Sequence, residues 1–305
     1  MKNKTRQKTV NILPFRIILK AVGINMNLID CHCHTANSPD GEGSVKQLCM
    51  RASELGLAVL GISEHCEANR LYSKEHYGSE PKNEYEIYDN ICIFEKSMAE
   101  NTASIYECPK NLTLLCGIEL GQPYADFCGS QSLIEDKRLD FVIASAHELC
   151  GKEDFAFLKY TKENVNGYLK EYFETIYQMC KWGKFDILAH LTYPLRYING
   201  IAKLNVDISQ YNEIISESFR LLIQNGKGIE INTSGLRQPY GLTFPTLEYV
   251  KLFKELGGEI ISIGSDAHCA DDLGKGIIDG IKLAEAGGFK YISYFKNRKP
   301  EFIKI

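Results

Sequence analysis

Seven short apolar segments recur along this chain from Met26 onward, and their spacing constrains the fold more than any other feature. They are rich in Val, Ile and Leu without polar alternation, which is typical of parallel strands buried on both faces of a sheet. The segments are NLID (27–30), LAVLGI (57–62), LTLLCGI (112–118), DFVIAS (140–145), FDILA (185–189), GIEIN (228–232) and EIISIG (259–264).

Amphipathic helical patterns separate these segments. The first begins at Ser44, with Gln47 three residues later as a capping-box pair, and it ends at Gly56. The predicted helices cover residues 44–56, 83–100, 162–183, 209–226, 244–258 and 271–287. This alternation predicts one α/β domain over residues 26–305, folded as a closed or nearly closed (β/α) barrel. An open doubly wound sheet is the alternative, and periodicity alone does not exclude it.

Charge and cysteine usage narrow the possible functions. Lys and Arg number 35 against 39 Asp and Glu, so the near-neutral balance offers no basic surface and argues against a nucleic-acid partner. None of the 11 cysteines forms a C-x-x-C pair, and several lie within apolar segments, which indicates reduced thiols in a cytoplasmic protein. No stretch of about 20 apolar residues is present, so we expect no membrane span.

The first 25 residues are interpreted separately. They are basic and then apolar, but Pro14, Arg16 and Lys20 interrupt the apolar part, so we expect no signal peptide. We expect residues 1–25 to be a disordered extension or a product of start-site choice. Two tyrosine-rich loops, about residues 66–85 and 191–208, are long enough to cover a site.

Six of the seven histidines occupy equivalent places, each just after one of the apolar segments. These strand-end positions hold His32, His34, His65, His147, His190 and His268, together with the carboxylates Glu119 and Asp266. In a barrel the carboxyl ends of the strands share one face, so these side chains should converge there. The seventh histidine, His76, matches no strand end and is assigned to a solvated loop.

The residue types predict a metal centre. Imidazole together with carboxylate suits Zn, Fe or Mn, and the spacing His32-x-His34 places two imidazoles on the same side of a strand. Asp40, in the loop after the first strand, can reach back to the same place. Nine candidate ligands exceed the four of one tetrahedral ion, but they suffice for two or three if Glu119 bridges. Each residue also has an ordinary structural explanation when it is considered alone. Asp40 would fit a turn, Glu119 could cap the following helix, and His190 could be a buried core histidine.

The ordered segments H-x-H…D-G, S-E-H, G-x-E, S-x-H, A-H and G-S-D-A-H resemble the polymerase and histidinol phosphatase (PHP) family, from about Asn27 to the C-terminus. The resemblance implies a distorted (β/α)7 barrel of the TIM type with a trinuclear metal centre. It assigns one ion to His32, His34, Glu119 and Asp266. A second ion would use Glu119, His147 and His190, and a third would use Asp40, His65 and His268.

The segments E-I-N-T-S-G-L-R and H-L-x-Y-P-L-R are most similar to the histidinol-phosphatase branch. That branch implies hydrolysis of a small phosphomonoester, L-histidinol phosphate, with Arg196 and Arg237 binding the phosphate. A metal-bound hydroxide would be the nucleophile, and no separate catalytic side chain is assigned. Glu148 departs from the pattern, because an apolar or aromatic residue is expected there.

Three other functions stay open. The same centre would serve a nucleotide or a phosphotyrosine protein as substrate. A nuclease is disfavoured because no basic groove is indicated. Outside catalysis, a degenerate metal-binding regulatory protein is the alternative, although all nine ligand types are present. The sequence does not decide which of Zn, Mn and Fe is bound, and it does not indicate an oligomeric state.

Overall fold

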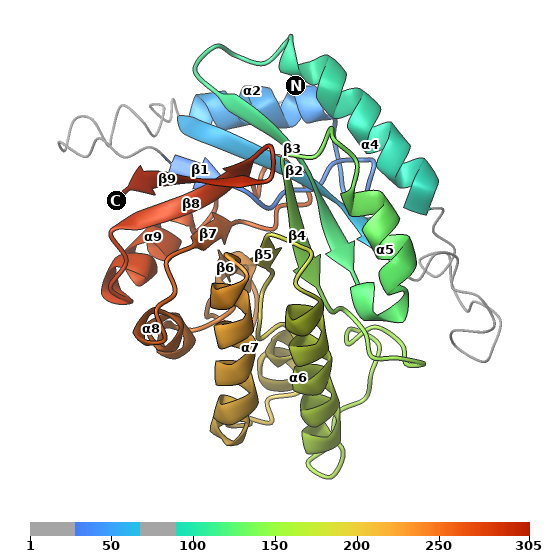
Figure 1. The fold of residues 1–305 in the computed structure, drawn as a ribbon, viewed down its shortest axis with the longest axis vertical. Helices are drawn as coiled ribbons and strands as arrows, with labels where there is room; N and C mark the ends of the chain where they lie inside the picture. The colour runs from blue at the N-terminus through green and yellow to red at the C-terminus, as the bar shows by residue number, and fades with distance from the viewer. Residues whose placement is uncertain (1–27, 68–89) are drawn as a thin grey trace, which may run out of the picture.

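A computed structural model describes residues 28–67 and 90–305 of the chain (Figure 1). Seven parallel strands form one sheet in the order of the sequence, and every residue of β4, β6 and β7 is buried. The strands are β1 (Leu28–Asp30), β2 (Leu57–Glu67), β3 (Thr113–Gly121), β4 (Phe141–Ser145), β5 (Ile187–Leu188), β6 (Gly228–Asn232) and β7 (Ile261–Gly264). All seven predicted strands are therefore confirmed.

The two edges of this sheet meet, so the barrel is nearly closed. The amide of Cys31 donates to the carbonyl oxygen of Ile263 at 3.0 Å, and further along the amide of Asp266 donates to His32 at 2.8 Å. A single parallel bridge joins Cys33 to Ala267. Contact between the first and last strands confirms the predicted barrel and rules out the open doubly wound sheet.

Helices surround the barrel (Figure 1). Ser44 caps α2 with its side chain on the amide of Gln47, while the Gln47 side chain accepts from the Ser44 amide, as the capping-box pattern predicted. The helices at or near the predicted positions are α2 (Val45–Leu55), α4 (Asn90–Ile105), α6 (Val165–Trp182), α7 (Asn212–Gln224), α8 (Leu247–Glu255) and α9 (Ile277–Ala286).

Two elements were not predicted. The short helix α5 (Phe127–Ile134) lies between β3 and β4, and its 8 residues are too few to show a helical period. An antiparallel hairpin of β8 (Tyr291–Lys296) and β9 (Lys299–Lys304) ends the chain. Its turn residues Asn297 and Arg298 both have positive φ. The amides of both residues donate to Asp140, just before β4, which places the hairpin turn at the amino-terminal end of the barrel.

The predicted loop at residues 191–208 is only partly irregular, because it contains the π-helical segment η3 (Arg196–Ile201). The predicted extension at residues 1–25, His76 and most of the 66–85 loop lie outside the described residues. Within the described ranges, no helix combines the length and the apolar character needed to span a bilayer.

Candidate metal centre

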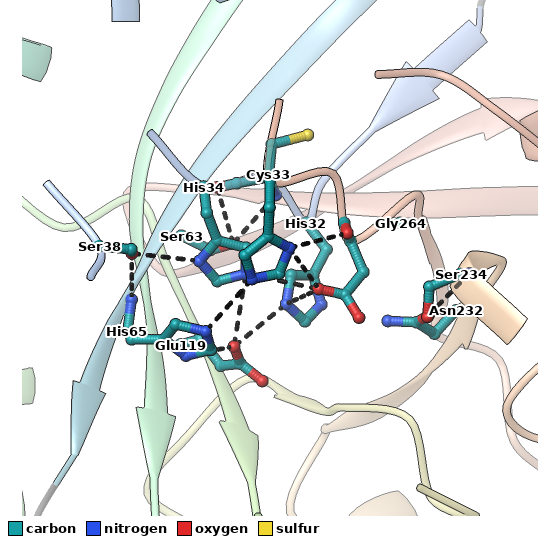
Figure 2. Close-up of polar contacts among 12 residues, drawn as sticks. His32, Cys33, His34, Ser38, Ser63, His65, Glu119, Asn232, Ser234 and Gly264 are labelled. Carbon is teal, nitrogen blue, oxygen red and sulfur yellow. Dashed lines mark hydrogen bonds and ion pairs between the residues drawn. The ribbon is translucent and has the colours of Figure 1, made fainter. Parts of the chain in front are cut away.

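The carboxyl ends of the strands bring the predicted residues together. Figure 2 shows His32, His34, His65 and Glu119 facing one another. His65 and Glu119 lie on paired positions of β2 and β3, and the other strand-end histidines follow β1, β4, β5 and β7. Four overlapping groups have ligand atoms close enough to hold an ion. They are His34, His65 and His268; His32, Glu119 and His190; His32, His34 and Asp266; and His65, Glu119 and His147.

Glu119 lies at the centre, fully buried, with its two oxygens facing different histidines. One oxygen, Oε1, is 2.8 Å from Nε2 of His190 and 3.1 Å from Nε2 of His147. The other, Oε2, is 3.0 Å from Nδ1 of His65 and 3.2 Å from Nε2 of His32. A carboxylate with this arrangement can bridge two ions.

A second carboxylate, Asp266, faces the His-x-His pair after β1. Its Oδ1 is 3.7 Å from Nε2 of His32 and 3.6 Å from Nε2 of His34. Asp266 adopts a left-handed backbone conformation, with φ of 54°. This turn directly after β7 lets Asp266 point inward at the level of the two histidines.

Asp40 completes an outer group at the more exposed side of the site. Its Oδ1 is 3.6 Å from Nε2 of His65 and its Oδ2 is 3.2 Å from Nε2 of His268. The His34 ring lies against both imidazoles, with centroid separations of 4.2 Å and 4.3 Å, and the two imidazole centroids are 5.6 Å apart. The loop residue Asp40 therefore does reach back to the strand ends.

Several buried atoms in the centre have no hydrogen-bond partner among the described residues. They are Nε2 of His32, Nε2 of His34, Nδ1 of His65, Nδ1 of His190 and Oε2 of Glu119. Buried polar atoms without partners are rare and costly in native proteins. Lone pairs of nitrogen and carboxylate oxygen that converge without donors fit a bound cation, so the donor set suits divalent metal ions.

The ionisation of these groups reflects their mutual contacts. Burial alone would raise the pKa of Glu119, but the facing imidazoles of His32, His147 and His65 hold that pKa well below its ordinary value. Burial opposes the charged form of His147, yet Glu119 and Glu67 raise its pKa to about 10. Burial lowers the pKa of His34, and the neighbouring imidazoles lower it further. The carboxylates therefore stay charged, as metal ligands have to be.

Both predicted phosphate-binding arginines lie beside Asp266. Arg196, at the start of η3, has Nη2 at 2.8 Å from Oγ of Ser234 and 3.2 Å from Oδ2 of Asp266. Its guanidinium lies over the ring of Tyr193, 4.9 Å from the centroid. Arg237, at the end of the short helix η5 (Ser234–Arg237), donates to the carbonyl oxygen of Asp266 at 3.2 Å. Two cationic side chains thus border the group of candidate ligands formed by His32, His34 and Asp266.

The PHP domain model matches residues 30–234, which include seven of the nine candidate ligands. The chain belongs to the PHP family. A "Probable histidinol-phosphatase" of Thermotoga maritima is 25% identical over 268 residues, covering 87% of this chain and 95% of the relative. A "Histidinol-phosphatase" of Lactococcus lactis is 25% identical over 279 residues, covering 90% of this chain and 96% of the relative.

A solved structure agrees with the fold of this PHP chain. The crystal structure of histidinol phosphate phosphatase from Lactococcus lactis, in complex with Zn, L-histidinol and phosphate, has a TM-score of 0.70 at 22% identity. The match covers 90% of this chain and 99% of that chain. With the family and these relatives, the chain is a hydrolase of phosphoric monoesters, as predicted.

Sequence reasoning missed Glu230, a buried carboxylate of this PHP centre. Its Oε1 is 2.7 Å from Nδ1 of His32, so Nε2 of that ring is left facing Glu119. A Cβ at Gly264 would lie 2.3 Å from Cβ of His32 and 2.4 Å from Oε1 of Glu230, so a glycine is required for this contact. The available signal was a lone acidic residue inside the buried segment GIEIN.

Glu67, at the end of β2, was also missed. Its Oε1 is 3.4 Å from Nδ1 of His147 and 3.6 Å from Nδ1 of His65. The Gln122 side chain donates to its other oxygen and accepts from the His147 amide at 3.0 Å. Such carboxylate contacts to a ligand imidazole fix the ring orientation and the tautomer. No spacing in the sequence distinguishes Glu67 from an ordinary strand-end residue.

Proposed function

We propose that this PHP phosphatase hydrolyses L-histidinol phosphate to L-histidinol and phosphate, the dephosphorylation step of histidine biosynthesis. The observation that carries the proposal is the gathering of eight other candidate ligands around Glu119, with two arginines beside Asp266. Support for the substrate comes from relatives named histidinol-phosphatase that match along almost their whole length. The similar crystal structure holds L-histidinol and phosphate.

The proposed ligands divide into three sets. One consists of His32, His34, Glu119 and Asp266; another of Glu119, His147 and His190; and the third of Asp40, His65 and His268. The distances of 2.8–3.7 Å between facing nitrogen and oxygen atoms support these sets. Zn, Mn and Fe all accept such ligands, and two or three ions would be bound.

Divalent ions held there would acidify a water molecule and neutralise charge on phosphate oxygens. The side chains of the protein would supply the other functions of the site. Glu119 spans the two inner sets, while Glu230 and Glu67 orient the rings of His32 and His147. Arg196 and Arg237 are proposed to bind the phosphate oxygens, for which the planar guanidinium is suited. Cations concentrated on one side of the phosphate would favour the added negative charge of the transition state.

Glu148 is the feature that favours a different phosphomonoester. This residue is buried directly after His147, and the hydroxyl of Tyr124 donates to its carbonyl oxygen. The histidinol-phosphatase branch is expected to have an apolar or aromatic residue at this position, next to the candidate ligand His147. A nucleotide or a phosphotyrosine protein is the alternative substrate class.

Steady-state phosphate release from purified protein with added Mn or Zn tests the proposal. L-histidinol phosphate, p-nitrophenyl phosphate and AMP would be compared. A kcat/KM for L-histidinol phosphate about a hundredfold above the others, some 2.7 kcal/mol of transition-state preference, is expected. Comparable weak rates on all three would reject this substrate. His147→Ala and Asp266→Asn should abolish turnover while the chain stays folded, and near-normal activity in either would reject the assigned centre.

A further inference from the structure

We propose that Asn232 and Ser234 are positioning residues that join the phosphate-binding Arg196 to the metal ligand His32. The inference rests on the proposed function for the roles of these two end residues. Neither Asn232 nor Ser234 faces a candidate metal ligand directly. Asn232 ends β6 opposite Gly264 of β7, and Ser234 begins η5 two residues later (Figure 2).

The connection is an unbroken series of short contacts. Nη2 of Arg196 is 2.8 Å from Oγ of Ser234, which is 2.6 Å from Oδ1 of Asn232. Nδ2 of Asn232 is 3.2 Å from Oε2 of Glu230. The other oxygen of that carboxylate, Oε1, is 2.7 Å from Nδ1 of His32.

The chemistry of the end groups fixes the direction of every hydrogen bond. A guanidinium only donates, so the Ser234 hydroxyl accepts from Arg196 and donates to Asn232. The Asn232 amide oxygen accepts from both the hydroxyl and the amide of Ser234, so its nitrogen has to face Glu230. The Glu230 carboxylate only accepts, so His32 carries its proton on Nδ1. In the neutral ring, Nε2 of His32 then keeps its lone pair and faces Glu119.

Burial makes this series specific. Asn232, Ser234 and Glu230 are at most 2% exposed, so water does not replace a lost partner. The backbone of Asn232 is already paired with Phe244 in both directions, at 2.9 Å each. Its side chain is therefore not needed to hold the strand end. Oε2 of Glu230 also accepts from the His190 amide at 2.9 Å, and Nη2 of Arg196 also pairs with Asp266 at 3.2 Å. Each missing link would therefore leave the neighbouring group held by one contact fewer, in a place that water does not reach.

Two substitutions distinguish the Arg196 end of the series from the His32 end. Ser234→Ala removes the acceptor for Arg196, but the amide of residue 234 still holds the Asn232 oxygen. It should raise the Kd for inorganic phosphate on metal-saturated protein about tenfold and leave the metal Kd within about twofold. Asn232→Ala removes a donor from Glu230 and the acceptor of the Ser234 hydroxyl. It should raise both dissociation constants about fivefold to tenfold.

Isothermal titration of Mn into stripped protein, and of inorganic phosphate into Mn-saturated protein, gives both constants without turnover. Ser218→Ala and Asn101→Ala are matched controls, because both residues are buried and lie on α7 and α4, away from the centre. They should change the melting temperature alone.

The positioning role is decided by comparing the Kd for Mn with the Kd for phosphate in each variant. Equal effects of Ser234→Ala on both constants, or no effect of either variant beyond that of its control, would overturn it. If Asn232→Ala fails to fold, the result for Ser234→Ala decides alone. Wild-type protein that binds Mn and phosphate but does not hydrolyse L-histidinol phosphate would reject the proposed substrate, and the two constants would still judge the positioning role.

Discussion

At the scale of single residues, the centre is organised around one carboxylate. Glu119 is fully buried, and its oxygens lie 2.8–3.5 Å from imidazole nitrogens of five histidines. Those histidines come from β2 or from positions just after β1, β4 and β5, so only the folded barrel brings them together. The two inner sets of proposed ligands share Glu119 and no other residue.

Replacement of Glu119 by glutamine should therefore be more damaging than its small change in shape suggests. Glu119→Gln keeps the volume but removes the negative charge and one acceptor between two groups of imidazoles. We expect kcat to fall at least about a thousandfold and one ion or more to be lost, because the bridge is removed. Metal content and phosphate release would be measured together. Glu255→Gln, on the exposed end of α8, is the control and should behave as wild type.

The stability of the metal-free form and the extra stability given by bound metal should change in opposite directions with pH. Against the effect of burial, Glu119 and Glu67 raise the pKa of His147 to about 10, above an unfolded value of roughly 6.5. Protonated His147 thus stabilises the metal-free fold fully below about pH 6.5, and this stability is lost as pH rises through about 10. Metal ligation needs the deprotonated ring, so apparent metal affinity rises over the same range.

Thermal unfolding of chelator-treated and metal-saturated protein, between about pH 6.5 and 9.5, measures this difference. The melting temperature of the metal-free form should fall with pH, while the increase caused by metal should grow. A metal-induced increase that is independent of pH would contradict the role of His147 as a ligand that exchanges a proton for metal.

The sequence could nominate the candidate ligands because all of them except Asp40 lie at or just after an apolar segment that predicts a strand. Glu230 and Glu67 could not be predicted, because their importance depends on distances of 2.7 Å and 3.4 Å to rings from other strands. A single glutamate within a strand gives no repeating pattern from which its role could be predicted. Arg196 and Arg237 came from family resemblance, and the structure places both beside Asp266.

At the scale of elements, the terminal hairpin is the largest part that the sequence analysis left unassigned. Its turn carries Arg298, whose Nη1 donates to the carbonyl of Ile134 at 2.8 Å and whose Nε pairs with Asp186. Asp186 is buried just before β5 and also accepts from the amide of Val142 at 2.9 Å. The hairpin was not predictable because its anchoring partners lie more than a hundred residues away.

Loss of this anchor should affect stability and spare the site. Arg298→Ala leaves the buried Asp186 with Lys227 as its remaining cationic neighbour, at 3.3 Å. Because Arg298 is itself partly exposed, we expect a cost of about 2 kcal/mol, below the usual cost of breaking a fully buried pair. Urea unfolding would show the loss, with kcat/KM unchanged. Arg220→Ala, which removes an exposed pair on α7, should cost little. Equal costs for the two variants would contradict this account of the hairpin.

At the scale of the whole molecule, the order of strands in the sequence is also their order around the barrel. That simple topology explains why the sequence could predict the fold together with a candidate site. Each segment that makes a strand also delivers one or two polar residues to the same end. The helix α5 and the hairpin were missed without consequence for the site, because the proposed ligands lie on neither of them.

Metal ions per chain, measured by mass spectrometry after chelator stripping and reloading, test the central claim most directly. Each ion should be matched by a rise in phosphate release from p-nitrophenyl phosphate. The account predicts two or three ions of Zn, Mn or Fe per wild-type chain, with fewer in Glu119→Gln. One ion or none at saturating metal, or full phosphatase activity in stripped protein, would contradict a multinuclear centre built from these nine residues.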